Sequence, residues 1–378
     1  MSDIKVSVII PVYNAAAFLD DCLGSLLSQT LREIEVIAVN DGSSDSSLEI
    51  LRGYEAADTR LKVIDQPNAG AGNARNTGLA AASGEYLSFL DADDIYEIDM
   101  LEKAYRAAAD SDSDLCVFAA DLFDNETGER RPCTWSFRRE YFTPGEAFDP
   151  HDESYAPYIF QMFNGWPWDK LYRRSMVEKY GLRYQELRST NDMYFVYMAE
   201  ALSDRIITLD ECLIHQRVSV STSISRNRDK SWDCFYLGLA ELKKGLLREG
   251  LYRTYRRSFR NWALNFTLWQ LRTMHGAAYE RAFALMKEKG LRELELSTGG
   301  RKYYYNRGEF SALLRLREYD AESFSRFLEH PQENGSTGLG AGRRLMICLR
   351  ENGPVYTVRH LFGKVKSRLK KQLCFGRK

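Results

Sequence analysis

The sequence predicts an α/β protein with a mostly parallel, Rossmann-like sheet flanked by helices and a C-terminal helical region. Three observations predict this class. Short apolar runs of strand length alternate with helix-length segments over the first 120 residues, the connections between them are short, and the pattern becomes helical after about residue 227. Alternation of this kind is typical of right-handed βαβ units.

The individual elements follow from the spacing of apolar residues. Five strands are expected, at residues 6–12, 35–40, 61–65, 86–90 and 115–120. Apolar positions at helical spacing predict intervening helices near residues 18–27, 48–51, 73–82 and 100–109. Residues 122–225 mix aromatic and polar side chains, which indicates a substrate-facing half with irregular loops. Further helices are expected at 232–247, 252–274, 277–289 and 312–316.

This organisation divides the chain into four parts. Residues 1–225 are expected to form the α/β domain, in two halves (1–120 and 121–225), and a helical region is expected at 226–331. Residues 332–342 are rich in glycine and read as a linker. Residues 343–378 are a basic tail, with eleven Lys or Arg and one acid. The tail is interpreted either as a helix lying on anionic lipid or as a solvated basic end.

Composition narrows the class of protein. The chain is 44% apolar and 28% charged with a net charge of -1, as in soluble globular proteins. Its seven cysteines are scattered without CxxC pairs, which favours a reducing compartment. We find neither a signal peptide nor an apolar stretch of membrane-spanning length, so a cytoplasmic protein is expected, with peripheral contact to the inner face of the membrane through the tail. No basic patch interleaved with aromatics indicates nucleic-acid binding.

Three acids directly follow the apolar run at residues 86–90. Asp91, Asp93 and Asp94 repel one another unless a cation lies among them, and hard cations such as Mg²⁺ or Mn²⁺ take oxygen ligands shared with a substrate phosphate. Asp41 ends the second strand, and the carboxyl ends of parallel strands share one edge of a sheet. The sequence therefore predicts a metal site for a phosphorylated substrate. An acidic turn that only caps a helix is the alternative.

The loop at residues 68–78 places Arg75 near the start of a helix, where a guanidinium and helix N–H groups favour a phosphate oxygen. Its Gly70-Ala71-Gly72 is not a dinucleotide fingerprint, because the loop follows the third strand and position 75 is arginine. The chain also lacks a GxxxxGK[ST] loop, which excludes P-loop NTPases.

Four stretches together resemble family 2 glycosyltransferases, which have the GT-A fold and invert configuration. They are residues 8–14, 39–45, 68–78 and 84–94. A weaker resemblance, at residues 168–173 and 191–195, is to bacterial surface-polysaccharide members. The resemblance implies transfer of a sugar from a nucleotide donor, UDP-linked, to a saccharide or lipid-linked oligosaccharide acceptor, with Mg²⁺ or Mn²⁺ as cofactor.

The resemblance also implies that residues 1–120 are the nucleotide-binding half and residues 121–225 the acceptor-binding half, and it implies roles for individual residues. Asp93 and Asp94 would bind the metal, and Asp192 aligns with the general base, although the chain has Asn191 where the family often has Glu. Asp169 and Glu186 are alternative bases, and a helix cap or salt bridge is the structural alternative for Asp192. The expected nucleotide-sugar contacts are Pro11, Val12, Tyr13, Asn14, Asp41, Asn68, Arg75, Asp91, Ala92 and Asp93.

A further set is assigned to the acceptor or to a lid: Trp166, Trp168, Asp169, Lys170, His215 and Arg217. Trp166 and Trp168 either stack on a sugar ring or pack in the interior. His215 or Arg217 either contacts the diphosphate or ends a surface strand.

Two other functions stay open. A sugar-phosphate nucleotidyltransferase would carry a Gly-rich basic loop after the first strand, where this chain has Val12-Tyr13-Asn14-Ala15. A non-catalytic sugar-nucleotide-binding subunit would not need Asp41, Asp93 and Asp192 together.

Overall fold

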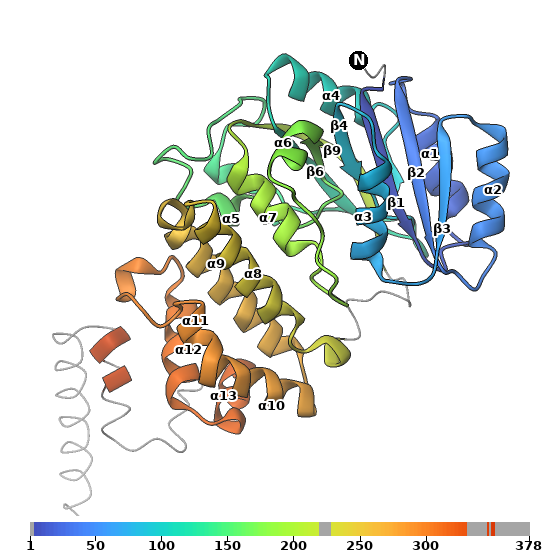
Figure 1. Ribbon diagram of the computed structural model, residues 1–378. Helices are drawn as coiled ribbons and strands as arrows, with labels where there is room; N and C mark the ends of the chain where they lie inside the picture. The colour runs from blue at the N-terminus through green and yellow to red at the C-terminus, as the bar shows by residue number, and fades with distance from the viewer. Residues whose placement is uncertain (1–3, 219–227, 331–345, 348, 352–378) are drawn as a thin grey trace, which may run out of the picture. The chain divides into compact units, whose positions relative to one another are not determined.

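The computed structural model describes residues 4–218, 228–330, 346–347 and 349–351 (Figure 1). The chain divides into two compact units, Met1–Phe259 and Arg260–Lys378. The predicted linker at 332–342 lies outside the described residues, as does nearly all of the predicted basic tail. Each unit is described by itself below.

A mixed sheet forms the first unit. Its strands are β1 (Val6–Val12), β2 (Ile34–Asp41), β3 (Leu61–Gln66), β4 (Tyr86–Phe89), β5 (Ile95–Tyr96), β6 (Leu115–Asp124), β7 (Arg130–Pro132), β8 (Lys170–Arg173) and β9 (Ile206–Val218). They lie in the order β3-β2-β1-β4-β8-β6-β9-β5, with β7 paired to β6. Strands β1 to β4 pair in parallel, as do β6 and β9, whereas β8 is antiparallel to both β4 and β6. The predicted fold class is confirmed.

The helices of this unit cover both faces of the sheet (Figure 1). They are α1 (Leu19–Leu27), α2 (Ser47–Ala57), α3 (Ala71–Ala81), α4 (Met100–Asp110), α5 (Ile159–Met162), α6 (Arg174–Lys179), α7 (Met193–Leu202) and α8 (Cys234–Arg248). The prediction of irregular loops at 122–225 was wrong in part, because this stretch contains β7, β8, β9 and α5 to α7.

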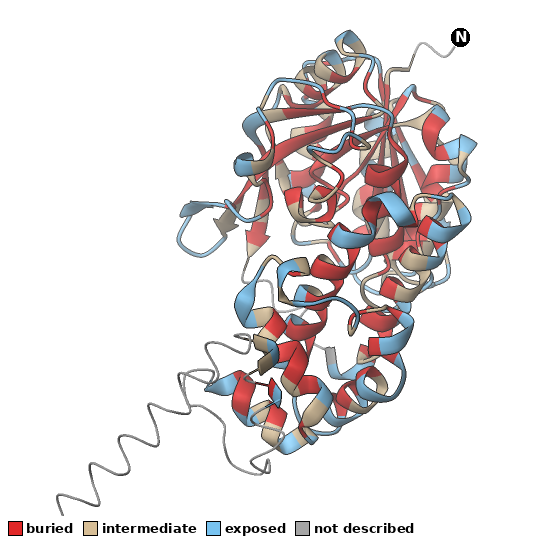
Figure 2. Cartoon of the chain, turned by 90° about the vertical axis from the view of Figure 1, so that its left-hand side faces the viewer, coloured by how far each residue is buried: buried red, intermediate tan, exposed pale blue. Residues whose placement is uncertain are grey.

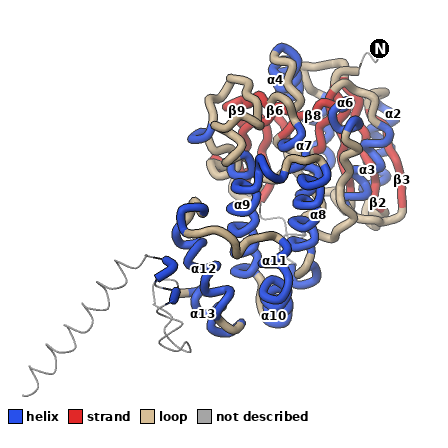
Figure 3. The backbone as a smooth tube through the Cα atoms, turned by 60° about the vertical axis from the view of Figure 1, so that its left-hand side comes forward, coloured by secondary structure: helices blue, strands red, loops and turns tan. Residues whose placement is uncertain are grey.

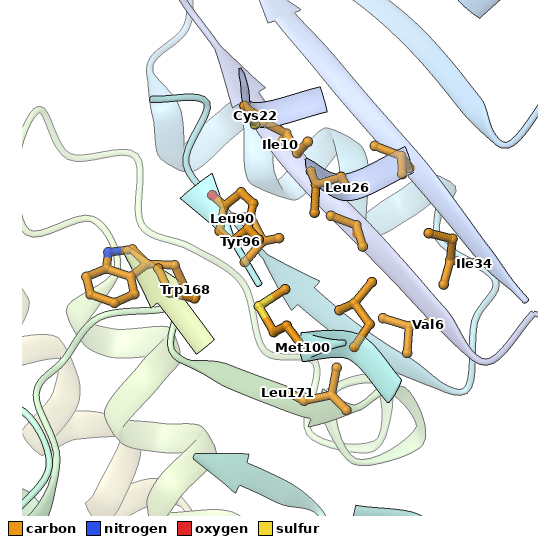
Figure 4. Close-up of a cluster of buried hydrophobic side chains, with 14 of the residues drawn as sticks. Val6, Ile10, Cys22, Leu26, Ile34, Leu90, Tyr96, Met100, Trp168 and Leu171 are labelled. Atoms are coloured by element: carbon orange, nitrogen blue, oxygen red, sulfur yellow. The ribbon is translucent and has the colours of Figure 1, made fainter. Parts of the chain in front are cut away.

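Alternation along β1 explains how the two faces are buried. Val8 and Ile10 belong to a core cluster that includes Leu23 of α1, and Figure 4 shows Ile10 beside Cys22 and Leu26. Ile9 points to the opposite face, where a Cβ added at Gly78 of α3 would lie 2.4 Å from its Cγ2. A glycine at this point therefore lets α3 approach the sheet closely. Figure 2 shows that the strands are buried along most of their length.

The second unit is helical (Figure 3). It begins within α9 (Tyr252–Thr273) and continues through α10 (Gly276–Leu285), a π-helical turn at Met286–Gly290, α11 (Leu291–Glu293), a 3₁₀ turn at Arg301–Tyr303, α12 (Arg307–Glu318) and α13 (Ala321–Glu329). Phe283, Phe310 and Phe324 lie in its interior. Among the described residues, no helix has the length and apolar character needed to span a bilayer.

Candidate functional site

The loop after β4 gathers three carboxylates. One oxygen from each of Asp91, Asp93 and Asp94 lies within 4.8 Å of the others, and Asp94 is buried. Burial, followed by the charge of Asp91, raises the pKa of Asp93 to about 6. Burial and the charges of Asp93 and Asp91 raise the pKa of Asp94 well above its ordinary value. This crowded, oxygen-only donor set fits a hard divalent cation, whose charge would offset the repulsion.

Arg217, near the end of β9, supports this carboxylate loop. Its backbone N–H donates to Asp94 Oδ1 (2.8 Å) and its Nε donates to the carbonyl oxygen of Asp93 (2.8 Å). The guanidinium also bonds Asp21 (2.9 Å) and Asn125, and it lies over the rings of Phe18 and Phe123. In this arrangement the guanidinium is fully engaged by the protein and acts as a counter-charge beside the acids.

Arg75 of α3 links the carboxylate loop to the start of α7. Its Nη2 donates to Asp91 Oδ1 (2.7 Å) and its Nη1 donates to Asn191 Oδ1 (3.1 Å). The guanidinium carbon lies 5.4 Å from the ring centroid of Tyr184, and the side chain is almost fully buried. Sequence reasoning placed Arg75 beside the nucleotide; the bridge to Asn191, 116 residues away along the chain, was not foreseen.

Asp192 is the residue that precedes the first turn of α7, and its side chain makes no capping hydrogen bond. Burial raises the pKa of its carboxyl group, while the Arg75 cation opposes that rise and the Asp91 charge adds to it. A carboxyl group with a raised pKa is a stronger base once ionised, and is therefore suited to accept a proton near neutral pH. The alternative residue Glu186 is exposed.

Asp41, at the end of β2, holds the loop that precedes α3. Its two carboxylate oxygens accept the backbone N–H groups of Ala69 (2.9 Å) and Gly70 (2.8 Å), and Oδ1 also accepts from Gln66. The side chain of Asn68 donates to the Asp41 carbonyl oxygen (2.9 Å). The carboxylate thus fixes the loop from within, which is a role that its position in the sequence did not reveal.

The end of β1 is tied to the loop after β2. Asn14 has a positive φ of 51°, its Oδ1 accepts the Ser44 N–H (2.7 Å), and its own N–H donates to Ser43 Oγ (3.0 Å). Of the other residues predicted here, Tyr13 is 55% exposed, Val12 is buried and Pro11 is half-buried. Tyr13 therefore offers an accessible ring beside two fixed loops.

The residues predicted for an acceptor or a lid lie deeper in the protein than expected. Trp166 and Trp168 stack on each other with centroids 4.5 Å apart, and Trp168 belongs to the buried core shown in Figure 4. Lys170 is fully buried and donates to Asp169 (2.7 Å) and to the carbonyl oxygens of Asn164 and Trp166. Burial raises the pKa of Asp169 to about 6 despite this contact.

His215 lies on β9 between two carboxylates. Its Nδ1 is 2.7 Å from Asp121 and its Nε2 is 2.8 Å from Glu97. It is buried and pairs across the sheet with Ile95 of β5. Ala92, within the carboxylate loop, is also buried.

Comparison with known proteins identifies the family. Residues 7–181 match the model of the family described as glycosyl transferase family 2. EpsH of Bacillus subtilis (strain 168), named as a glycosyltransferase, is 34% identical over 249 residues, which are 65% of this chain and 69% of EpsH. The chain belongs to glycosyltransferase family 2. The glycosyltransferase GlyA of Streptococcus pneumoniae is 33% identical over 232 residues, 61% of this chain but only 33% of GlyA.

This family 2 glycosyltransferase also resembles solved structures in fold. The S. aureus TarS fragment 1–349, crystallised with UDP-GlcNAc, has a TM-score of 0.67 at 21% sequence identity, covering 87% of this chain and 93% of the fragment. The likeness extends beyond the residues matched by the family model, since 87% of the chain is covered. The predicted GT-A fold and glycosyltransferase activity are confirmed.

Proposed function

We propose that this glycosyltransferase moves a sugar from a UDP-sugar to a saccharide or lipid-linked saccharide acceptor, with inversion of configuration and with Mg²⁺ or Mn²⁺. The observation that carries the proposal is Arg75, which joins the carboxylate loop through Asp91 and the start of α7 through Asn191, next to Asp192. Arg75 thereby connects the carboxylate loop, which is suited to a metal-bound diphosphate, with the start of α7, where Asp192 is suited to accept a proton.

The metal would be held by Asp93 and Asp94, with Asp91 beside them. A divalent ion bound there would stabilise the negative charge that develops on the departing nucleoside diphosphate. The three carboxylate oxygens are close enough to share one ion. Arg217 fixes their loop through hydrogen bonds to the Asp94 carboxylate and the Asp93 carbonyl oxygen.

Asp192 would act as the general base. In a single displacement its carboxylate removes the proton from the acceptor hydroxyl, the acceptor oxygen bonds to the anomeric carbon, and the bond from that carbon to the diphosphate oxygen breaks, with its electron pair leaving on UDP. An α-linked donor then gives a β-linked product. UDP-GlcNAc bound to the similarly folded TarS supports a nucleotide-sugar donor, and the carboxylate at the start of α7 supports inversion without a covalent intermediate.

The proposal is tested by measuring UDP release from UDP-Glc, UDP-Gal, UDP-GlcNAc, UDP-GalNAc and UDP-GlcA with Mn²⁺ or Mg²⁺. We expect one donor to be turned over by the wild type and not by Asp192→Asn, which should still bind UDP. Nuclear magnetic resonance of the product should show the anomeric configuration opposite to that of the donor. A retained configuration, or full turnover by Asp192→Asn, would refute the mechanism.

A further inference from the structure

The carboxylate loop leads directly into β5, a strand of only two residues. This strand pairs with residues 214–215 of β9, and the backbone N–H of Glu97, which follows it, donates to the carbonyl oxygen of Leu213 (3.0 Å). The carbonyl oxygen of Glu97 accepts from the buried side chain of Gln29 (2.7 Å). Because so short a strand offers few backbone hydrogen bonds, side-chain contacts add to the attachment at this end of the loop.

His215 of β9 connects Glu97 to the rest of the sheet. Its Nε2 lies 2.8 Å from Glu97 Oε1 and its Nδ1 lies 2.7 Å from Asp121 Oδ1, so the ring spans from β6 to the residue after β5. Each contact needs a hydrogen on the ring nitrogen that faces the carboxylate, because a carboxylate oxygen only accepts. Arg130 of β7 lies 3.6 Å from the same Glu97 oxygen. Side chains of β7 and β9 therefore meet at one carboxylate just past the loop.

The same end of β9 is also attached to the loop itself. His215 lies two residues before Arg217, and the alternation of a strand places both side chains on one face of the sheet. The Arg217 backbone N–H donates to Asp94 Oδ1, and its Nε donates to the Asp93 carbonyl oxygen. A shift of this end of β9 would move the Arg217 N–H away from the Asp94 carboxylate, and the contact between His215 and Glu97 opposes such a shift.

The surroundings of His215 leave it no direct role at the substrate. Its side chain is 3% exposed, and both ring nitrogens are engaged by carboxylates. In the described part of the chain, the carboxylates suited to one metal ion are Asp91, Asp93 and Asp94, and His215 does not belong to that group. Any effect of His215 on the reaction therefore passes through the residues that it holds.

We propose that His215 is a positioning residue of the metal site, which sets the affinity of the carboxylate loop for its divalent ion through Glu97 and the end of β9. The proposal rests on the proposed function, because it takes the carboxylate loop as the metal site. Removing a residue that holds a metal ligand in place typically weakens metal binding by about 10–100-fold. His215 acts through one further contact, so we expect an effect at the lower end of this range.

Electron paramagnetic resonance of Mn²⁺ with the full chain and saturating UDP tests the proposal. His215→Leu and Glu97→Ala should each weaken Mn²⁺ binding by about tenfold. Glu97→Gln keeps an oxygen facing the ring and should retain most of the wild-type affinity. The Glu97 side chain is 42% exposed, so Glu97→Ala should fold even if His215→Leu, which leaves the Asp121 carboxylate unpaired, does not.

Two control variants isolate the contact between His215 and Glu97. Arg130→Ala removes the longer contact to Glu97 and should bind Mn²⁺ as the wild type does. Glu211→Ala removes an exposed ion pair between β9 and Lys103, and it should also leave the affinity unchanged. Weakened binding in either control, equal to that in Glu97→Ala, would overturn the proposal.

Turnover separates positioning from a general loss of structure. At saturating Mn²⁺ the kcat and the donor KM of Glu97→Ala should return close to the wild-type values, because added metal fills the weakened site but does not repair a damaged fold. A kcat that stays low at saturating Mn²⁺ would overturn the proposal. Wild-type Mn²⁺ affinity in both His215→Leu and Glu97→Ala, with weak binding by Asp93→Asn, would overturn it and leave the metal site intact. Equal Mn²⁺ binding by the wild type and Asp93→Asn would refute the metal site, and this proposal with it.

Discussion

Replacing Lys170 by methionine should destabilise the first unit strongly. The ammonium group is fully buried, donates three hydrogen bonds, and lies 3.8 Å from Glu200, whose carboxylate has no hydrogen-bond partner among the described residues. Methionine has nearly the same shape but leaves the Asp169 and Glu200 carboxyl groups without a cation. Removing one member of a buried ion pair costs about 3–5 kcal/mol. For a domain of this size the loss corresponds to a fall of roughly 6–20 °C in Tm.

The loss of stability in Lys170→Met should be larger at high pH than at low pH. The pKa of Asp169 is already raised to about 6 in the folded protein, above the roughly 3.9 of an unfolded aspartate, and burial also raises the pKa of Glu200 well above its ordinary value. Ionising these groups therefore costs stability as the pH rises. Without the lysine the folded pKa values rise further, so the deficit of Lys170→Met should be largest near pH 8 and shrink as the pH falls through about 6.

Urea denaturation of the wild type and Lys170→Met at pH 5 and pH 8 measures this effect. Lys62→Met, which removes an exposed lysine of β3, is the control and should leave the midpoint unchanged. An unchanged midpoint for Lys170→Met at pH 8, or a deficit that grows toward pH 5, would refute the reasoning. If Lys170 instead bound the acceptor, as the sequence predicted, the variant would keep its stability and show a raised KM for the acceptor.

Three further predictions concern the site and the packing beside it. Arg75→Met should move the acidic limb of the pH profile of kcat to higher pH, because Arg75 lowers the pKa of Asp192 in the wild type and its removal raises that pKa. Arg75→Lys, which keeps a cation, should move the limb less. Identical profiles for the wild type and both variants would contradict the bridge. Arg217→Met should raise the Mn²⁺ concentration needed for half-maximal turnover more than it changes the donor KM, as measured by metal titration. An equal change in both would leave Arg217 with a purely structural role. Gly78→Ala should lower the free energy of unfolding by about 1–3 kcal/mol, because the added Cβ meets a methyl carbon of β1 at 2.4 Å, and a urea midpoint equal to that of the wild type would contradict this packing.

The first half of the α/β domain was predictable because its strands are continuous apolar runs. The expected strands at 6–12, 61–65 and 86–90 agree with β1, β3 and β4 within a residue or so. Strand β8 was missed because its four residues, Lys-Leu-Tyr-Arg, carry charges at both ends. Strand β9 was missed because exposed residues interrupt its apolar pattern, at the point where its register with β6 shifts.

The clustering of the three acids was predictable because they lie within four positions of one loop. The contacts that position these acids were not predictable, because they join residues far apart in the sequence. Arg75 bonds Asn191, 116 residues away, and Arg217 bonds Asp94, 123 residues away. Lys170 was predicted to contact the acceptor or belong to a lid because residues 168–173 resemble surface-polysaccharide members of the family. Its burial depends on three hydrogen-bond partners that are brought together only by folding.

The most direct test of the account is the binding of Mn²⁺ in the presence of UDP, followed by electron paramagnetic resonance. The wild type and Asp192→Asn should both bind one Mn²⁺ per chain in a UDP-dependent manner, while Asp93→Asn should bind at least tenfold more weakly. Equal Mn²⁺ affinity in Asp93→Asn and the wild type would contradict the assignment of the carboxylate loop as the metal site.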